Sequence, residues 1–229
     1  MNNFTSLIAG STGFLGSKIL NALNQEDNKI YCLSRRDNNH SSSNIEQIIV
    51  NFESLEEIKL PKVDHVFLCL GYELRAWELL SMPERLKKPF YKVDYDYTLE
   101  IAKKSLDSGS DSISLISAIG ANSTSPSFYL KTKGNIEEAI KKLPFKKINI
   151  FHPGHLAGRI DWQRKKNDPR IDVFAFEAAS LFFDPFMISS LKKFRSINAD
   201  KLAKFVVNKS KDNKYGINYM SYNDFTSKK

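Results

Sequence analysis

The chain has 229 residues, of which 41% are hydrophobic and 26% charged, and these proportions are typical of a globular protein rather than a disordered or fibrous one. Its net charge of +8 comes from short basic runs mixed with acidic neighbours, so we interpret it as solvated surface lysine and expect no nucleic-acid partner. No apolar run approaches the roughly 18 residues of a membrane-spanning helix, so no membrane span is expected.

The first half of the chain alternates apolar runs with segments of helical periodicity. We predict strands at 4–9, 30–33, 45–52 and 66–70. A helix is predicted to start at Phe14, and the polar segment 37–44 is predicted to form an exposed loop. The last of the four runs is apolar throughout, which is typical of a strand with both faces covered.

The second half continues this alternation and then departs from it. We predict helices at 90–107, 128–143 and 200–207, and strands at 113–118, 148–151 and 215–222. The apolar stretch 173–186 is predicted to be a helix that caps one end of the domain. Strands that alternate with helices favour parallel pairing through right-handed crossovers.

The predicted fold is therefore α/β, a Rossmann-type doubly wound parallel sheet with helices on both faces. We expect residues 1–229 to form a single dinucleotide-binding domain. Within it, the segment 154–196 and the C-terminal segment are expected to form a small lobe on the substrate side.

Three glycines follow the first predicted strand and open the first predicted helix. Gly10 permits a tight turn, Gly13 lets the backbone approach a diphosphate, and Gly16 lets helix and strand pack closely. The helix N-terminus adds free N–H groups and positive potential, both of which favour an anion. We therefore expect the phosphates of a dinucleotide on the loop formed by Gly10, Ser11, Thr12, Gly13, Phe14, Leu15 and Gly16.

The end of the second predicted strand selects the cofactor. Ser34, Arg35 and Arg36 lie about twenty residues beyond the glycine loop, where an acid would accept from the ribose of NAD and an arginine would pair with the 2′-phosphate of NADP. A guanidinium fits a phosphate because its planar fork makes two parallel charged hydrogen bonds. The pattern favours NADP(H) over NAD(H), although Asp37 could serve NAD.

The segment around 117–133 carries a candidate catalytic set. Tyr129 and Lys133 are four residues apart, on one face of a predicted helix, and Ser117 ends the preceding strand at the carboxyl edge of the sheet. A lysine ammonium would lower the pKa of the tyrosine and favour proton exchange with a carbonyl oxygen. Ser117 could orient that oxygen.

The cysteines and histidines predict no further chemistry. Cys32 and Cys69 lie in apolar runs, and two such cysteines do not form a disulfide framework. The first residues show no signal peptide, which would be a basic segment followed by an apolar one. We therefore expect a cytoplasmic protein. His152 and His155 could reach one metal ion, but no third ligand is evident nearby, so no metal is expected.

Five segments and a turn resemble the Tat-interacting tumour-suppressor family of atypical short-chain dehydrogenase/reductases. They are Asn51-Phe52-Glu53, Cys69-Leu70-Gly71, Val93 to Tyr97, Ser117 to Ala121, Phe128 to Gly134, and His152-Pro153-Gly154. The similarity extends over roughly residues 3–225, which is more specific than any single motif. His152 departs from the arginine that is usual in that family, and Tyr72 to Arg75 departs from the small residues that often follow Leu-Gly.

The resemblance implies a cofactor site and a dehydrogenase-type catalytic set. It implies that the cofactor also contacts Asn51, Phe52, Leu70, Gly71, Tyr129, Lys133, Pro153 and Gly154. The first functional hypothesis is an NADP(H)-dependent oxidoreductase acting on a small carbonyl compound or its alcohol, of unknown identity. The alternative is a catalytically weak NADPH-binding sensor that acts through a protein partner.

Overall fold

The computed structural model describes residues 4–26, 28–38, 42–159 and 195–227, together with 172, 175 and 184. Its centre is a parallel sheet of seven strands in the order β3-β2-β1-β4-β5-β6-β9. The strands are β1 (Thr5–Ala9), β2 (Lys29–Ser34), β3 (Ile45–Ile49), β4 (His65–Leu68), β5 (Ser112–Ile116), β6 (Lys147–Phe151) and β9 (Gly216–Met220). The predicted doubly wound parallel sheet is confirmed.

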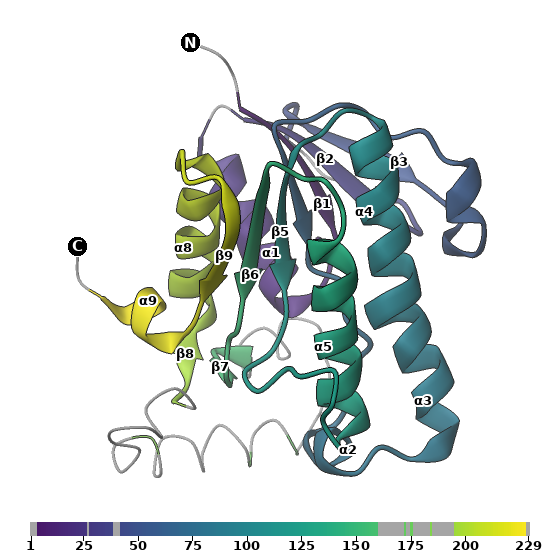
Figure 1. Ribbon diagram of the computed structural model, residues 1–229. Helices are drawn as coiled ribbons and strands as arrows, with labels where there is room; N and C mark the ends of the chain where they lie inside the picture. The colour runs from purple at the N-terminus through teal and green to yellow at the C-terminus, as the bar shows by residue number, and fades with distance from the viewer. Residues whose placement is uncertain are drawn as a thin grey trace.

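Helices cover both faces of the sheet (Figure 1). On one face α1 (Phe14–Asn24) packs against α8 (Ala199–Lys211), and their shared core includes Ile19 and Leu202. On the other face α4 (Thr98–Asp107) and α5 (Phe128–Lys141) bury a second core that includes Ile101 and Ile136. Both faces of the central strands are thus removed from water, which explains the continuous apolar run of residues 66–68 in β4.

The long helix predicted at 90–107 is three consecutive pieces. They are α3 (Glu84–Tyr91), the π-helix η2 (Lys92–Tyr97) and α4. Sequence periodicity could not detect the π-helix, because Val93, Tyr97 and Ile101 keep the four-residue spacing of a regular helix. π-Helical turns occur frequently at functional sites, and η2 contributes a buried acid to the candidate site described below.

Short elements lie around the carboxyl edge and the margins of the sheet. They are η1 (Phe52–Glu57), α2 (Ala76–Leu80), the paired strands β7 (Leu156–Ala157) and β8 (Ile197–Asn198), and α9 (Tyr222–Thr226). Figure 1 places α2 and β7 beyond the ends of the central strands, at the edge where α1 begins. Except for residues 175 and 184, the helix predicted at 173–186 lies outside the described residues. Within the described part of the chain, no helix combines the length and apolarity needed to cross a membrane.

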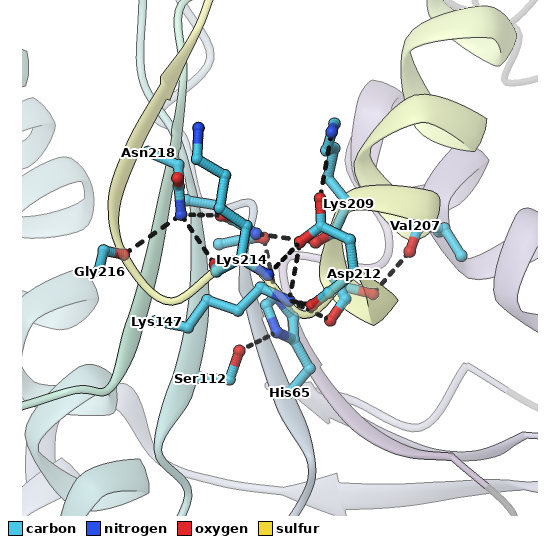
Figure 2. A network of polar contacts seen from close by, with 12 residues as sticks. His65, Ser112, Lys147, Val207, Lys209, Asp212, Lys214, Gly216 and Asn218 are labelled. Carbon is cyan, nitrogen blue, oxygen red and sulfur yellow. Dashed lines mark hydrogen bonds and ion pairs between the residues drawn. The ribbon is translucent and has the colours of Figure 1, made fainter. Parts of the chain in front are cut away.

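A buried polar network joins β4, β5, β6 and the end of α8, as Figure 2 shows. The two ring nitrogens of His65 lie 2.7 Å from the hydroxyls of Ser112 and Ser114. The Lys147 ammonium donates to the carbonyl of Ser210 at 2.8 Å and pairs with Asp212 at 3.4 Å. These bonds satisfy polar groups that would otherwise be costly to bury.

Burial lowers the pKa of His65 well below its ordinary value of 6.5, and the positive charge of Lys147 adds to this effect while Asp212 opposes it. Unfolded His65 therefore takes up a proton as the pH falls through 6.5, whereas the folded protein keeps it neutral. The stability that this difference contributes is present above pH 6.5 and is lost as the pH falls toward the folded pKa.

We predict that the free energy of unfolding falls below pH 6.5, with His65 contributing up to about 1.4 kcal/mol per pH unit. The control is His65→Gln, which retains hydrogen-bonding groups but does not titrate. Urea unfolding between about pH 8 and pH 5 should show a shallower acid slope in the variant. The same slope in both proteins would contradict this role for His65.

Candidate active site

The loop between β1 and α1 is shaped by close backbone approach. Gly10 has a φ of +93°, and a Cβ at this position would lie 2.5 Å from the carbonyl oxygen of Cys69, just after β4. A Cβ on Gly16 would overlap the carbonyl oxygen of Gly10. A side chain at either position would therefore force apart the loop, the start of α1 and the end of β4.

The N-terminus of α1 has the features expected of an anion-binding site. Gly13 is the N-cap residue and offers no side-chain cap, and no acidic residue stands in the first turn. A Cβ on Gly13 would meet only the Gly10 carbonyl oxygen, at 3.3 Å, whereas those on Gly10 and Gly16 would collide with backbone. The backbone and positive end of the helix thus fit the diphosphate of a dinucleotide, which Ser11, Thr12, Phe14 and Leu15 would also adjoin.

The turn after β2 presents two arginines. Ser34 donates to the carbonyl of Arg36 at 2.8 Å, and Gln47 of β3 donates to both Ser34 and that carbonyl. These bonds fix the turn while both guanidinium groups remain exposed. No described carboxylate lies within ion-pairing distance of Arg35, so its charge is available to a phosphate.

Apart from Tyr129 and Lys133, the cofactor residues implied by the family resemblance follow the ends of strands. Asn51 accepts a hydrogen bond from the backbone of Glu53 at 3.0 Å, and Phe52 is buried edge-on against Tyr97. Leu70 and Gly71 follow β4, and Pro153 and Gly154 follow β6. Their shared position at the carboxyl edge is where open α/β sheets bind ligands, but no contact here assigns any of them to the cofactor.

Lys133 forms a buried ion pair with Asp94 of η2. Its Nζ lies 2.7 Å from Asp94 Oδ1, and the two side chains are only 9% and 2% exposed. The other carboxylate oxygen accepts a hydrogen bond from the backbone N–H of Tyr72 at 2.7 Å. One carboxylate therefore fixes both the lysine and the loop after β4. Burial lowers the pKa of Lys133, but Asp94, Tyr129 and Glu137 together raise it above 10.5, so the ammonium stays charged.

Tyr129 lies one helical turn before Lys133, as the spacing predicted, and its ring packs beside Phe90 with centroids 5.6 Å apart. Burial raises the pKa of Tyr129 above its ordinary value of 10, Lys133 lowers it, and Asp94 raises it again. The net shift is upward, opposite to the expected lowering. The reason is that burial outweighs the ammonium, whose charge is already balanced by Asp94.

Ser117 lies just beyond β5, but its hydroxyl points into a second buried cluster. It donates to Oε1 of Glu137, and the same oxygen lies 2.8 Å from Nε2 of His152. Glu137 follows Lys133 by one turn of α5, so Tyr129, Lys133 and Glu137 share one face of that helix. The structure thus brings Tyr129 and Lys133 together, whereas Ser117 bonds to Glu137 in the described contacts.

Three contributors to this site escaped the sequence analysis. Asp94 supports the loop after β4 through its bond to Tyr72, and its ion pair with Lys133 joins residues too distant in the chain for the sequence to indicate. Glu137 had a usable signal, because it continues the four-residue spacing of Tyr129 and Lys133. Arg159 had none: its guanidinium lies 5.7 Å from the centroid of Phe14 in the glycine loop and pairs with Glu73 at 3.2 Å.

Cys32 is buried and Cys69 is partly buried, and neither thiol is reactive. Burial raises the pKa of Cys32 to about 11 and that of Cys69 to about 12. Neither forms a disulfide. At neutral pH neither supplies the thiolate that nucleophilic or redox chemistry requires.

We predict that Asp94→Ala lowers the free energy of unfolding by about 3 kcal/mol, because it leaves a buried ammonium without its partner. The matched control is Asp96→Ala, an exposed acid on the same π-helix, which should change stability by less than about 0.5 kcal/mol. Urea unfolding measures both variants. A loss at Asp94 no larger than that at Asp96 would show that the ion pair does not hold this site together.

The sequence of the chain is similar to those of a known protein family. Residues 6–147, more than half of the chain, match the NAD dependent epimerase/dehydratase family. Protein FMP52 of Meyerozyma guilliermondii is 33% identical over 157 residues, covering 67% of this chain and 65% of that protein. Rat Protein HTATIP2 is 29% identical over 163 residues, covering 68% and 64%. The resemblance to the Tat-interacting family is confirmed, although the match spans slightly less than two thirds of each relative.

The expectation of a cytoplasmic protein is wrong. The FMP52 relatives from Meyerozyma guilliermondii, Candida glabrata, Emericella nidulans and Candida albicans are all named mitochondrial proteins. Two unpaired thiols indicate a reducing compartment without specifying which one, so they do not establish a cytoplasmic location.

Solved structures support the dinucleotide-binding fold. Human epimerase family protein SDR39U1, solved with NADPH, superposes with a TM-score of 0.65 at 16% identity, covering 95% of this chain and 74% of that one. A short chain dehydrogenase from Leptospira borgpetersenii, solved with NAD+, gives a TM-score of 0.68 at 18% identity, covering 98% and 93%. These two neighbours share the fold of this chain, and one was solved with NADPH and the other with NAD+. By its matched region and its fold, the chain belongs to the NAD dependent epimerase/dehydratase family.

Proposed function

We propose that this protein is an NADP(H)-dependent oxidoreductase that acts on a small carbonyl compound or its alcohol. The observation that carries the proposal is the placement of Tyr129 and Lys133 on one face of α5, with Lys133 fixed by the buried Asp94. This set lies at the same edge of the sheet as the glycine loop. A bound nicotinamide cofactor would supply the hydride.

The chain's own contribution to the reaction would be a positioned proton donor. The raised pKa of Tyr129 keeps its phenol protonated at neutral pH, and this is the form that can donate a proton to a carbonyl oxygen. The charged ammonium of Lys133 would stabilise the phenolate left after the transfer. Its pair with Asp94 holds the ammonium in place, so little reorganisation would be needed during the reaction.

The cofactor preference is proposed from the turn after β2. Arg35 and Arg36 are exposed there on a backbone fixed by Ser34 and Gln47, and a 2′-phosphate would meet positive charge. NADPH and NADH differ only in the 2′-phosphate on the adenosine ribose. Discrimination between them should therefore depend on these guanidinium groups.

A catalytically weak NADPH sensor remains the second candidate, and one observation favours it. The hydroxyl of Ser117 donates to Glu137, so it is not poised to orient a substrate oxygen in this state. A screen of carbonyl compounds that follows NADPH absorbance separates the two candidates. Oxidation of NADPH by any of these compounds supports the enzyme, whereas tight NADPH binding without turnover supports the sensor.

We predict that Tyr129→Phe lowers carbonyl reduction by about a hundredfold or more while the Kd for NADPH changes by less than about threefold. The phenyl ring retains the packing on Phe90 but lacks the proton donor. Tyr31→Phe, which removes a phenol from the middle of β2, is the matched control and should retain full activity. Undiminished turnover in Tyr129→Phe would remove this residue from the mechanism.

Arg35→Ala should weaken NADPH binding by about tenfold or more, because a charged hydrogen bond to the 2′-phosphate is lost. NADH serves as the internal control, since it lacks that phosphate, and its affinity should stay within about twofold. Calorimetric titration measures both ligands. Equal losses for the two would refute the proposed contact.

A further inference from the structure

A cavity lies between α2 and α3, beside the candidate active site. Its volume is about 560 Å³, within the usual range for small-molecule sites. Its walls come from residues within 72–78 and from Arg85 and Leu86 of α3. The catalytic and cofactor residues proposed above do not line it.

Two contacts connect this cavity to the candidate active site. Tyr72, in its wall, donates its backbone N–H to the carboxylate of Asp94, whose other oxygen holds Lys133. Glu73 pairs with Arg159, whose guanidinium lies over the ring of Phe14 in the glycine loop. The cavity wall is therefore linked through Asp94 to Lys133 and through Arg159 to the glycine loop. A substrate that reacts beside Tyr129 could extend into the cavity.

The acidic residues of the wall already have partners. Glu73 is paired with Arg159 at 3.2 Å. Glu78 is buried and accepts a hydrogen bond from the backbone N–H of Arg75 at 2.7 Å, which closes the first turn of α2. Glu73 thus pairs with an arginine outside the wall, and Glu78 bonds to the backbone of Arg75 rather than to its guanidinium, so neither carboxylate forms an ion pair with Arg75 or Arg85.

The cations of the wall are exposed. Arg75 and Arg85 have no carboxylate within ion-pairing distance among the described residues, and each presents a guanidinium that can bind an anion in two-pronged fashion. The guanidinium of Arg75 lies 5.2 Å from the ring centroid of Trp77, and that tryptophan is 52% exposed. The cavity thus offers positive charge beside a flat apolar surface.

We infer that this cavity binds the distal end of the substrate, and that the substrate is a carbonyl compound carrying a planar apolar group with a carboxylate or phosphate. Arg75 and Arg85 bind the anion, and Trp77 packs against the planar group. The inference rests on the proposed oxidoreductase function and specifies its substrate class. Binding of such an anion can nevertheless be measured without turnover.

The probes are naphthoate, naphthyl phosphate and the neutral naphthamide, with affinities measured by ligand-observed NMR on protein saturated with NADPH. We expect at least one anion to bind about ten times more tightly than the amide, and Arg75→Gln and Arg85→Gln each to weaken that anion by about fivefold or more. The anion that binds better identifies carboxylate or phosphate as the preferred group. Lys88→Gln, an exposed residue of α3 outside the cavity, makes the same charge change and should have no effect.

Equal affinity for the amide and both anions would overturn the inference, and so would arginine variants that behave like Lys88→Gln. The Kd for NADPH should remain within about twofold in all three variants, which separates this site from Arg35. If the protein takes up no NADPH, the proposed function fails. The affinities for naphthoate are then compared without cofactor. Weaker naphthoate binding in the two arginine variants, but not in Lys88→Gln, would still establish the anion site.

Discussion

The backbone contact between the β1–α1 loop and the end of β4 is the constraint on which the site depends. Gly10 approaches Cys69 so closely that a Cβ would lie 2.5 Å from its carbonyl oxygen, and Gly16 packs against Gly10. This contact sets the position of α1 relative to β4. The N-terminus of α1 is consequently directed at the edge of the sheet where the proposed cofactor residues gather.

The buried pair of Lys133 and Asp94 has the corresponding role for the chemistry. A buried ion pair adds little net stability, since desolvation offsets its attraction, but it fixes geometry. Asp94 binds the lysine with one oxygen and the loop after β4 with the other, so α5, η2 and this loop are held in one arrangement. The irregular π-helix is what brings this carboxylate to both partners.

Much of the fold could be predicted because strands rich in apolar residues alternate along the chain with helices that have one apolar face. The glycine loop and the pairing of Tyr129 with Lys133 depend on local spacing, which the sequence displays directly. The contacts of Asp94 and of the Ser117 hydroxyl could not be predicted from local spacing. They join residues distant in the chain and depend on which neighbour the fold supplies. Compartment is not a property of packing at all, and free thiols could not determine it.

The central claim is that bare backbone at the start of α1 binds the diphosphate of a dinucleotide. Calorimetric titration of the purified protein with NADPH and with NADH tests it most directly. The account predicts saturable uptake of one dinucleotide per chain, with the tighter affinity for NADPH. Absence of uptake for both cofactors would contradict it and would leave the residues of α5 without a source of hydride.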